Sequence, residues 1–286
     1  MEDKKFIDIQ KLLRNKAPKL NKWLPGFVIS LFKKLLHEND INACMLALKD
    51  DTGLEFNSKV IDWMGVKVEA VNSHFIPKTG SIVIAANHPL GGLDGLALTK
   101  TVGAVRPDVR FFVNDILKSI DNYGELFIAV NKLGSSSASS LRVMEEVFRT
   151  ECALLFFPAG MVSRKQNGII RDLQWKKSFV TQAIDHKRMI QPVFIEGQNS
   201  NFFYNFAIWR KRIGIKANIE MLFLPDEMFN PRTKIIKIHF SKPFDSSLLD
   251  DSKSHKQWAA FIYEYIYSKE FQKGMPFEEY RLKNIN

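Results

Sequence analysis

From about residue 68 onward, short apolar runs alternate with stretches of helical periodicity, and no other feature constrains the possible fold as strongly. Apolar runs rich in β-branched and aromatic residues predict strands, whereas apolar residues three and four apart predict helices. Strands that alternate with helices indicate an α/β domain with a mixed, mostly parallel central sheet flanked by helices. The predicted strands are 66–71, 81–87, 109–114, 152–160, 190–197 and 235–244, and the predicted helices are 94–103, 138–150, 175–188 and 256–271.

The first 67 residues lack these strand-like runs and are predicted to be helical. Between Phe27 and Leu36, apolar residues recur at roughly helical spacing, and across the whole segment Arg14 and several lysines occupy the opposite faces. An aromatic, basic and amphipathic segment suits an anionic membrane surface, and a helical layer packed on the protein's own core is the alternative interpretation. We therefore expect an N-terminal helical segment over 1–67, which either associates with a membrane or packs inward, and an α/β domain over 68–286.

One predicted strand ends at a histidine, His88, and an aspartate, Asp94, follows after two glycines. An imidazole can take a proton from an alcohol at neutral pH, and it does so best when a carboxylate holds its other nitrogen. Gly91 and Gly92 precede a predicted helix, where backbone amides favour negative charge, so they would donate to a developing oxyanion. The alternative interpretation is a capped turn that contains an incidental histidine.

The stretch NHPLGGLDG, residues 87–95, resembles the His/Asp signature of the glycerolipid acyltransferases, the lysophosphatidate-acyltransferase-like superfamily. The usual signature has four residues between the histidine and the aspartate, and this chain has five. That longer form is similar to a bacterial branch of hemolysin-like proteins and O-acyltransferases of ornithine and glycine aminolipids. Further similar segments follow in the same order at 127–132, 154–164, 190–197 and 236–244, so the resemblance covers roughly residues 66–245.

The resemblance implies that residues 68–286 form an acyltransferase domain. His88 would deprotonate an acceptor hydroxyl, and Asp94 would orient the imidazole. The hydroxyl would then attack a fatty acyl thioester of acyl carrier protein or coenzyme A, without an acyl-enzyme, a metal ion or a bound cofactor. The chain contains no Gly-x-Ser-x-Gly nucleophile motif, which agrees with direct transfer.

The resemblance also assigns residues that bind substrate. The glutamate that the family carries in its Phe-Pro-Glu-Gly block is Ala159 here, which disfavours a lysophosphatidate acceptor and favours a lyso-aminolipid with a hydroxylated chain. Lysophosphatidate or another lysophospholipid is the alternative acceptor. Lys132 and Arg164 would hold an anionic group, or they are solvated surface charges, and Asp172 and Trp175 could line the site. The expected substrate-binding residues are Asn87, Gly91, Gly92, Lys132, Phe157, Pro158, Ala159, Gly160 and Arg164.

Charge and targeting signals restrict the partners and the location. The 41 lysines and arginines exceed the 31 aspartates and glutamates, and a net charge of +10 attracts an anionic membrane, an acidic carrier protein or nucleic acid. Nucleic acid is not expected, because no helix-turn-helix, RNP or zinc signature is present. The basic run 209–216 suits anionic head groups, an acidic carrier protein or a solvated helix face.

Two cysteines without metal-ligand spacing favour a reducing compartment. The chain offers no apolar stretch of signal-peptide or membrane-spanning type, so we expect a cytoplasmic protein that lies on the inner face of the cytoplasmic membrane. A non-catalytic lipid-binding or nucleic-acid-binding protein is the remaining alternative from another functional class.

Overall fold

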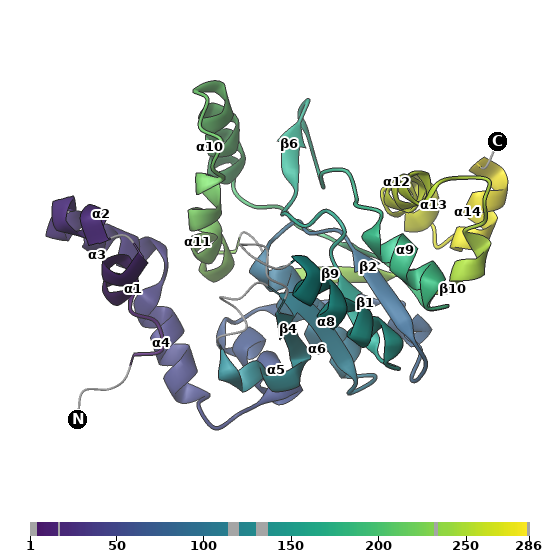
Figure 1. The fold of residues 1–286 in the computed structure, drawn as a ribbon, viewed down its shortest axis with the longest axis horizontal. Helices are drawn as coiled ribbons and strands as arrows, with labels where there is room; N and C mark the ends of the chain where they lie inside the picture. The colour runs from purple at the N-terminus through teal and green to yellow at the C-terminus, as the bar shows by residue number, and fades with distance from the viewer. Residues whose placement is uncertain (1–4, 17, 114–119, 130–136, 232–233, 285–286) are drawn as a thin grey trace.

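The computed structural model describes residues 5–16, 18–113, 120–129, 137–231 and 234–284 (Figure 1). Within these ranges, eight strands form one central sheet in the order β1-β9-β8-β2-β5-β3-β4, and β10 pairs with the first residues of β8. The strands are β1 (Lys67–Val71), β2 (Ile82–Ala86), β3 (Val109–Val113), β4 (Phe127–Ala129), β5 (Ala153–Phe156), β8 (Met189–Ile195), β9 (Ile235–Phe240) and β10 (Phe244–Asp245).

Most neighbouring strands are parallel. The strands β8, β2, β5, β3 and β4 all run in one direction, β1 is parallel to β9, and the pairs β8–β9 and β8–β10 are antiparallel. The prediction of a mixed, mostly parallel sheet is therefore confirmed. Every residue of the central strand β2 is buried, as expected for a strand covered on both faces.

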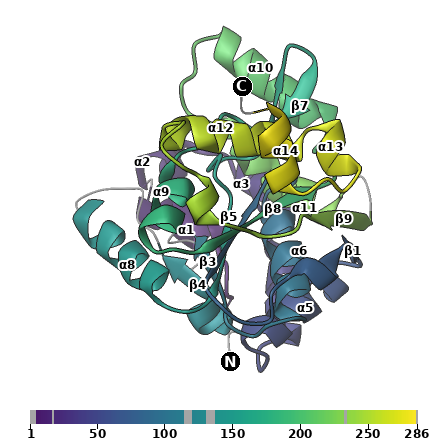
Figure 2. The same ribbon diagram turned by 90° about the vertical axis from the view of Figure 1, so that its right-hand side faces the viewer.

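Two helical layers cover the sheet (Figure 2). Successive side chains of β2 point to opposite faces, so Ile84 enters one core and Val83 enters the other. The first core lies under α5 (Gly53–Trp63), α6 (Gly92–Gly103) and the short helix η2 (Asp121–Leu126). The second lies under α8 (Ser137–Arg149), α9 (Ser178–Asp185), α12 (His255–Ile266), α13 (Lys269–Gln272) and α14 (Phe277–Asn284).

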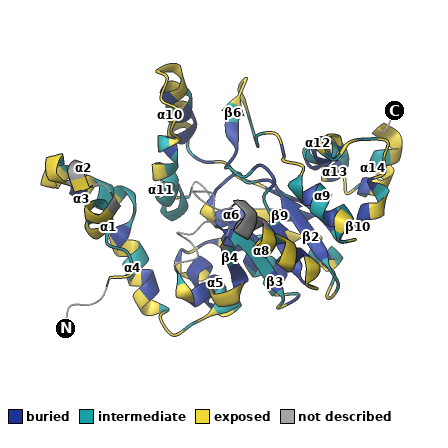
Figure 3. Cartoon of the chain, in the orientation of Figure 1, coloured by how far each residue is buried: buried dark blue, intermediate teal, exposed yellow. Residues whose placement is uncertain are grey.

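In the part of the chain that the structure describes, the N-terminal segment consists of helices joined by short connections, as predicted, and its earlier and later helices differ in burial. Side chains of the later helices, such as Met45 and Phe56, enter the first core. The earlier helices extend beyond the sheet and expose large apolar side chains, among them Trp23, Phe27 and Leu31 (Figures 1 and 3). These earlier helices are α1 (Ile9–Lys16), α2 (Pro18–Trp23) and α3 (Gly26–Leu35), and α4 (Glu38–Ala47), which carries Met45, connects them to α5.

Two predicted strands end earlier than the sequence indicated. The run 152–160 leaves the sheet after Phe156, because Phe157 starts a turn in which its carbonyl accepts the amide of Gly160 (φ 66°). The run 235–244 is divided into β9 and β10. Pro243 lies between the two strands, and a proline cannot donate a hydrogen bond to a sheet.

A third group of elements stands on the sheet's edge. It has a small core of its own that includes Val162, Phe203 and Tyr204. The group consists of the hairpin β6 (Arg164–Gln166) and β7 (Ile169–Arg171), α10 (Asn201–Arg212), η3 (Ile219–Phe223) and α11 (Leu224–Phe229). The remaining short helices are η1 (Ser73–Phe75) and η4 (Ser246–Leu248). Among the described residues, no helix combines the length and the apolar character needed to cross a bilayer.

Candidate active site

The candidate site lies where two neighbouring parallel strands end. His88 follows β2, and Phe157 follows β5, which pairs directly with β2. The carboxyl ends of parallel strands share one edge, and in open α/β sheets this edge is the usual position of a site. The ring of Phe157 stacks on the imidazole of His88, with centroids 4.2 Å apart and planes 17° apart. The aromatic ring thus limits the orientations that the imidazole can adopt.

Asp94 reaches the imidazole of His88 from the first turn of α6. Its Oδ2 atom lies 3.0 Å from His88 Nδ1 and also accepts the backbone amides of Leu90 (2.8 Å) and Gly91 (3.0 Å). Asp94 is fully buried, and burial raises the pKa of its carboxyl group, while the hydrogen bonds from His88 and the two amides act in the opposite direction. The five-residue spacing therefore brings the carboxylate and the imidazole into contact.

The outer nitrogen of His88 remains available for chemistry. The side chain is 19% exposed, and Nε2 has no hydrogen-bond partner among the residues that the structure describes. A proton on Nδ1 that is donated to Asp94 leaves Nε2 as a hydrogen-bond acceptor. The arrangement can therefore accept a proton from a hydroxyl group that approaches Nε2.

The two glycines of the turn have different roles. The amide of Gly91 bonds to Asp94, so it is not the free oxyanion donor that the sequence suggested. Gly91 also has φ 80°, and a Cβ atom there would lie 3.3 Å from side-chain atoms of Val162 and Leu224, so the tight turn requires glycine. Gly92 starts α6, and its amide makes no bond to Asp94.

Asn87 belongs to the sheet rather than to a binding surface. Its Nδ2 atom donates to the carbonyl of Ile195 (2.9 Å), and its Oδ1 atom accepts the amide of the same residue (2.6 Å). The side chain is buried, so both of its polar atoms are used to join the end of β2 to the end of β8. This corrects the expectation that Asn87 binds substrate.

Arg164 is buried in an ion network, which corrects both interpretations of it, the anion clamp and the solvated charge. Its Nη2 atom lies 3.0 Å from Glu220 Oε1, and Nη1 donates to the carbonyl of Val162 (3.0 Å). Arg210 contacts the same carboxylate, with Nε 2.7 Å from Oε2. Burial lowers the pKa of Arg164, and Glu220 opposes that shift. The guanidinium group of Arg164 is thus occupied within the protein.

Of the four residues 157–160, Phe157 alone contacts His88 through a ring. Pro158 and Ala159 are buried, Ala159 in the second core, and the carbonyl of Pro158 accepts the amide of Lys176. Gly160 is half-buried at the end of the turn. Lys132 lies outside the described residues.

Asp172, which the sequence suggested could line the site, contacts the backbone of His88. Its carboxylate accepts the backbone amide of His88 (3.1 and 3.2 Å), the hydroxyl of Ser163 (2.6 Å) and the indole N–H of Trp175 (3.0 Å). The amide of Ser163 in turn donates to the carbonyl of His88 (2.8 Å). Burial raises the pKa of Asp172. The backbone of His88 is therefore held on both sides, and Trp175 is part of the core.

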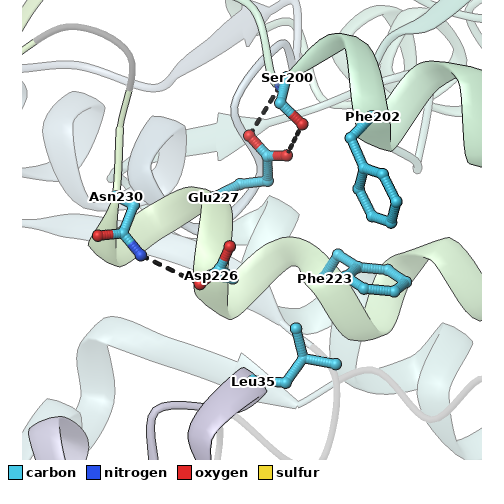
Figure 4. Close-up of a pocket in the computed structure, with 7 residues that line it drawn as sticks. All are labelled: Leu35, Ser200, Phe202, Phe223, Asp226, Glu227 and Asn230. Carbon is cyan, nitrogen blue, oxygen red and sulfur yellow. Dashed lines mark hydrogen bonds between the residues drawn. The ribbon is translucent and has the colours of Figure 1, made fainter.

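A separate cavity of about 320 Å³ lies beside α11 (Figure 4). Leu224 and Met228 of α11 face the turn that contains Gly91 and Gly92, whereas other residues of the same helix line the cavity. Because His88 does not line it, we do not assign the cavity to the reaction. Its lining residues are Leu35, Ser200, Phe202, Phe223, Asp226, Glu227 and Asn230.

Comparison with known proteins assigns the chain to a family. A protein family described as Acyltransferase matches residues 11–273, which is most of the chain. The chain belongs to this acyltransferase family. The match confirms the resemblance to glycerolipid acyltransferases that the His/Asp signature indicated.

Two similar relatives have the same description. The acyltransferase is 40% identical over 263 residues to the "Lyso-glycine lipid O-acyltransferase" of Bacteroides thetaiotaomicron, covering 92% of this chain and 97% of the relative. It is 39% identical over 263 residues to the protein of that description from Phocaeicola vulgatus, covering 92% and 94%. A solved structure, the 1-acyl-sn-glycerophosphate (LPA) acyltransferase of Thermotoga maritima, matches with a TM-score of 0.48 and 13% identity over 89% of this chain and 88% of that one.

Proposed function

We propose that this acyltransferase transfers a fatty acyl group from an acyl thioester to the hydroxyl group of a lyso-aminolipid. The observation that carries the proposal is the contact of 3.0 Å between His88 Nδ1 and Asp94 Oδ2, which leaves Nε2 free to act as a base. The relatives described as lyso-glycine lipid O-acyltransferases support the class of acceptor.

In the proposed reaction, Nε2 of His88 takes the proton of the acceptor hydroxyl as its oxygen attacks the thioester carbonyl carbon. The buried carboxylate of Asp94 stabilises the imidazolium that forms. The tetrahedral intermediate expels the thiolate, the carbon–sulfur bond breaks, and the imidazolium returns the proton to sulfur. The products are an ester and a free thiol. The amide of Gly92, at the N-terminus of α6, is the proposed donor to the oxyanion.

The ion network favours an acceptor without a phosphate group. A phosphate is typically recognised by a free arginine or lysine, and Arg164 instead pairs with Glu220. This agrees with the replacement of the family's glutamate by Ala159. A lysophosphatidate or another lysophospholipid is the alternative acceptor, and it would need cations other than Arg164.

The proposed donor is a thioester of acyl carrier protein or coenzyme A, because both carriers are anionic and the chain has a net charge of +10.

We further propose a peripheral position on the inner face of the cytoplasmic membrane. Exposed Trp23, Phe27 and Leu31 of the N-terminal segment 1–67 are suited to a membrane interface. We propose that segment 1–67 and the acyltransferase domain over 68–286 differ in function, although the last helices of the segment contribute side chains to the core of the domain.

The test is acyl transfer by the purified protein. Acyl carrier protein and coenzyme A thioesters would be offered with lyso-glycine lipid, lyso-ornithine lipid or lysophosphatidate, and His88→Ala would be assayed in parallel. Product from a lyso-aminolipid alone, lost in His88→Ala, is the expected result. Product from lysophosphatidate alone would replace the acceptor. Lipid binding without transfer would favour the non-catalytic alternative, and transfer that survives in His88→Ala would exclude the mechanism.

A further inference from the structure

The end of α10 exposes apolar and basic side chains together. Trp209 is 53% exposed and Ile213 is 51% exposed. Between and beside them, Lys211, Arg212 and Lys216 are also exposed. A solvated basic helix face accounts for the cations but not for the two large apolar side chains. We call Trp209, Lys211, Arg212, Ile213, Ile215 and Lys216 the α10 tip.

The α10 tip is held from the inside. Arg210 points inward and is buried, and its Nη1 atom donates to the carbonyl of Ile215 (2.8 Å). The same guanidinium pairs with Glu220, which also pairs with Arg164 of the hairpin β6–β7. The turn that follows α10 is thus fixed by buried ions, and the side chains on either side of Arg210 are presented to the outside in a defined arrangement.

The α10 tip lies on the side of the sheet that carries the candidate active site. The strands β2, β5 and β8 are parallel, so the segments that follow them leave from one edge. His88 follows β2, the hairpin follows β5, and α10 follows β8. Both the hairpin and α10 project beyond the sheet on the same side (Figures 1 and 2). Ile169, at the turn of the hairpin, is 60% exposed.

The positive charge around the α10 tip favours an anionic partner. Residues 197–219 contain no aspartate or glutamate, and the nearest acid along the chain, Glu220, is buried and paired. Exposed tryptophan and isoleucine side chains among cations are typical of a surface that enters the head-group region of an anionic bilayer. An acidic protein would be attracted by the same cations, but it would not by itself require half-exposed apolar side chains.

We propose that the α10 tip, together with Ile169 of the hairpin, docks the enzyme on an anionic lipid bilayer with the edge that holds His88 toward the lipid. This contact is separate from that proposed for the N-terminal helices. The bilayer contact of the α10 tip rests on the proposed function in one respect: it would let a lipid acceptor reach His88 from the membrane.

The experiment is vesicle flotation of the full chain, which needs no turnover. The vesicles contain phosphatidylcholine alone or an equal mixture with phosphatidylglycerol. The variants are Trp209→Ser with Ile213→Ser, and Lys211→Gln with Arg212→Gln. The matched control is Lys269→Gln with Lys273→Gln, two exposed lysines at the start of α13 and directly after its end, at the far end of the molecule (Figure 1).

We expect both tip variants to bind the mixed vesicles about tenfold or more weakly, and the control to bind like the wild type. Acyl transfer to a detergent-dispersed acceptor should be unchanged in all three, while transfer to vesicle-embedded acceptor should fall in the tip variants. Unchanged vesicle binding by both tip variants overturns the proposal. A raised KM for acyl carrier protein with unchanged vesicle binding would instead assign the tip to that protein. Because flotation is independent of turnover, failure of the proposed reaction leaves this result interpretable.

Discussion

The carboxylate of Asp172 accepts the backbone amide of His88 at 3.1 Å, although 84 residues separate the two along the chain. Asp94 holds the imidazole of the same histidine from six residues away. One histidine is therefore fixed twice, by a local contact to its ring and by a distant contact to its backbone. We regard Asp172 as a positioning residue, because it contacts the main chain of His88 and not the reacting atoms.

Asp172→Asn should lower kcat about ten- to a hundredfold with little change in the acceptor KM, since a small displacement of a base slows transfer without removing binding contacts. Asparagine keeps one oxygen as an acceptor, but its N–H₂ group then faces either the hydroxyl of Ser163 or the indole N–H of Trp175, both of which donate to Asp172 in the wild type. Steady-state kinetics on folded protein tests this. Asp185→Asn, at the end of α9, is the control. If the fall in kcat is explained entirely by a smaller fraction of folded protein, Asp172 has only a structural role.

Asp94→Asn should reduce transfer by about 10³- to 10⁴-fold, because the imidazolium loses its counter-charge. The fold should persist, since the amide oxygen can take the place of Oδ2 and the N–H₂ group can take that of Oδ1, which has no partner among the described residues. The assay is acyl transfer beside thermal unfolding. Near-normal activity in a folded variant would exclude Asp94 from the mechanism.

Asp94→Asn should also change how the free energy of unfolding depends on pH. Burial raises the folded-state pKa of Asp94 above its ordinary value of 3.8, so folding takes up a proton between these two values. The free energy of unfolding of the wild type should therefore fall as the pH rises through this window, and Asp94→Asn should lack that contribution. Denaturant unfolding of both proteins from acidic to neutral pH measures it. Parallel pH profiles for the two proteins would contradict the raised pKa.

Phe157→Leu should slow transfer about two- to tenfold, the range expected for the loss of one aromatic stacking contact, here between Phe157 and the ring of His88. Phe156→Leu is a matched control, because Phe156 packs on the opposite face of the sheet against Phe112 and Phe179. The control should lose stability without a specific loss of rate. Kinetics and unfolding of both variants, measured side by side, distinguish the two effects, and equal rates in both would remove the role of the stack.

Glu220→Gln should destabilise the protein by about 3–5 kcal/mol, because two buried guanidinium groups, Arg164 and Arg210, would lose their shared carboxylate. Replacement of all three by apolar residues should recover much of that loss. Urea unfolding of the single and triple variants tests the prediction. A single variant as stable as the wild type would show that solvent reaches the network.

The sequence by itself determined the features that depend on short spacing. The alternation of apolar runs gave the sheet and its layers, because hydrophobic periodicity follows the geometry of one element at a time. The His88–Asp94 contact was predictable for the same reason, since a glycine turn and one helical turn join them. The turn also shows why Gly91 was misjudged: its amide direction depends on the backbone angles, which the sequence does not specify.

Tertiary structure decided the contacts between distant segments. Arg164 was predicted to be an anion clamp or a surface charge, and it became an internal ion because the chain returns Glu220 to the hairpin after α10. Strand order put Phe157 on His88, and the path after β5 brought Asp172 beneath the same residue. The type of residue determines which hydrogen bonds and ion pairs its side chain can form. Which partner reaches it first, and whether water is excluded there, is fixed only when the whole chain has packed.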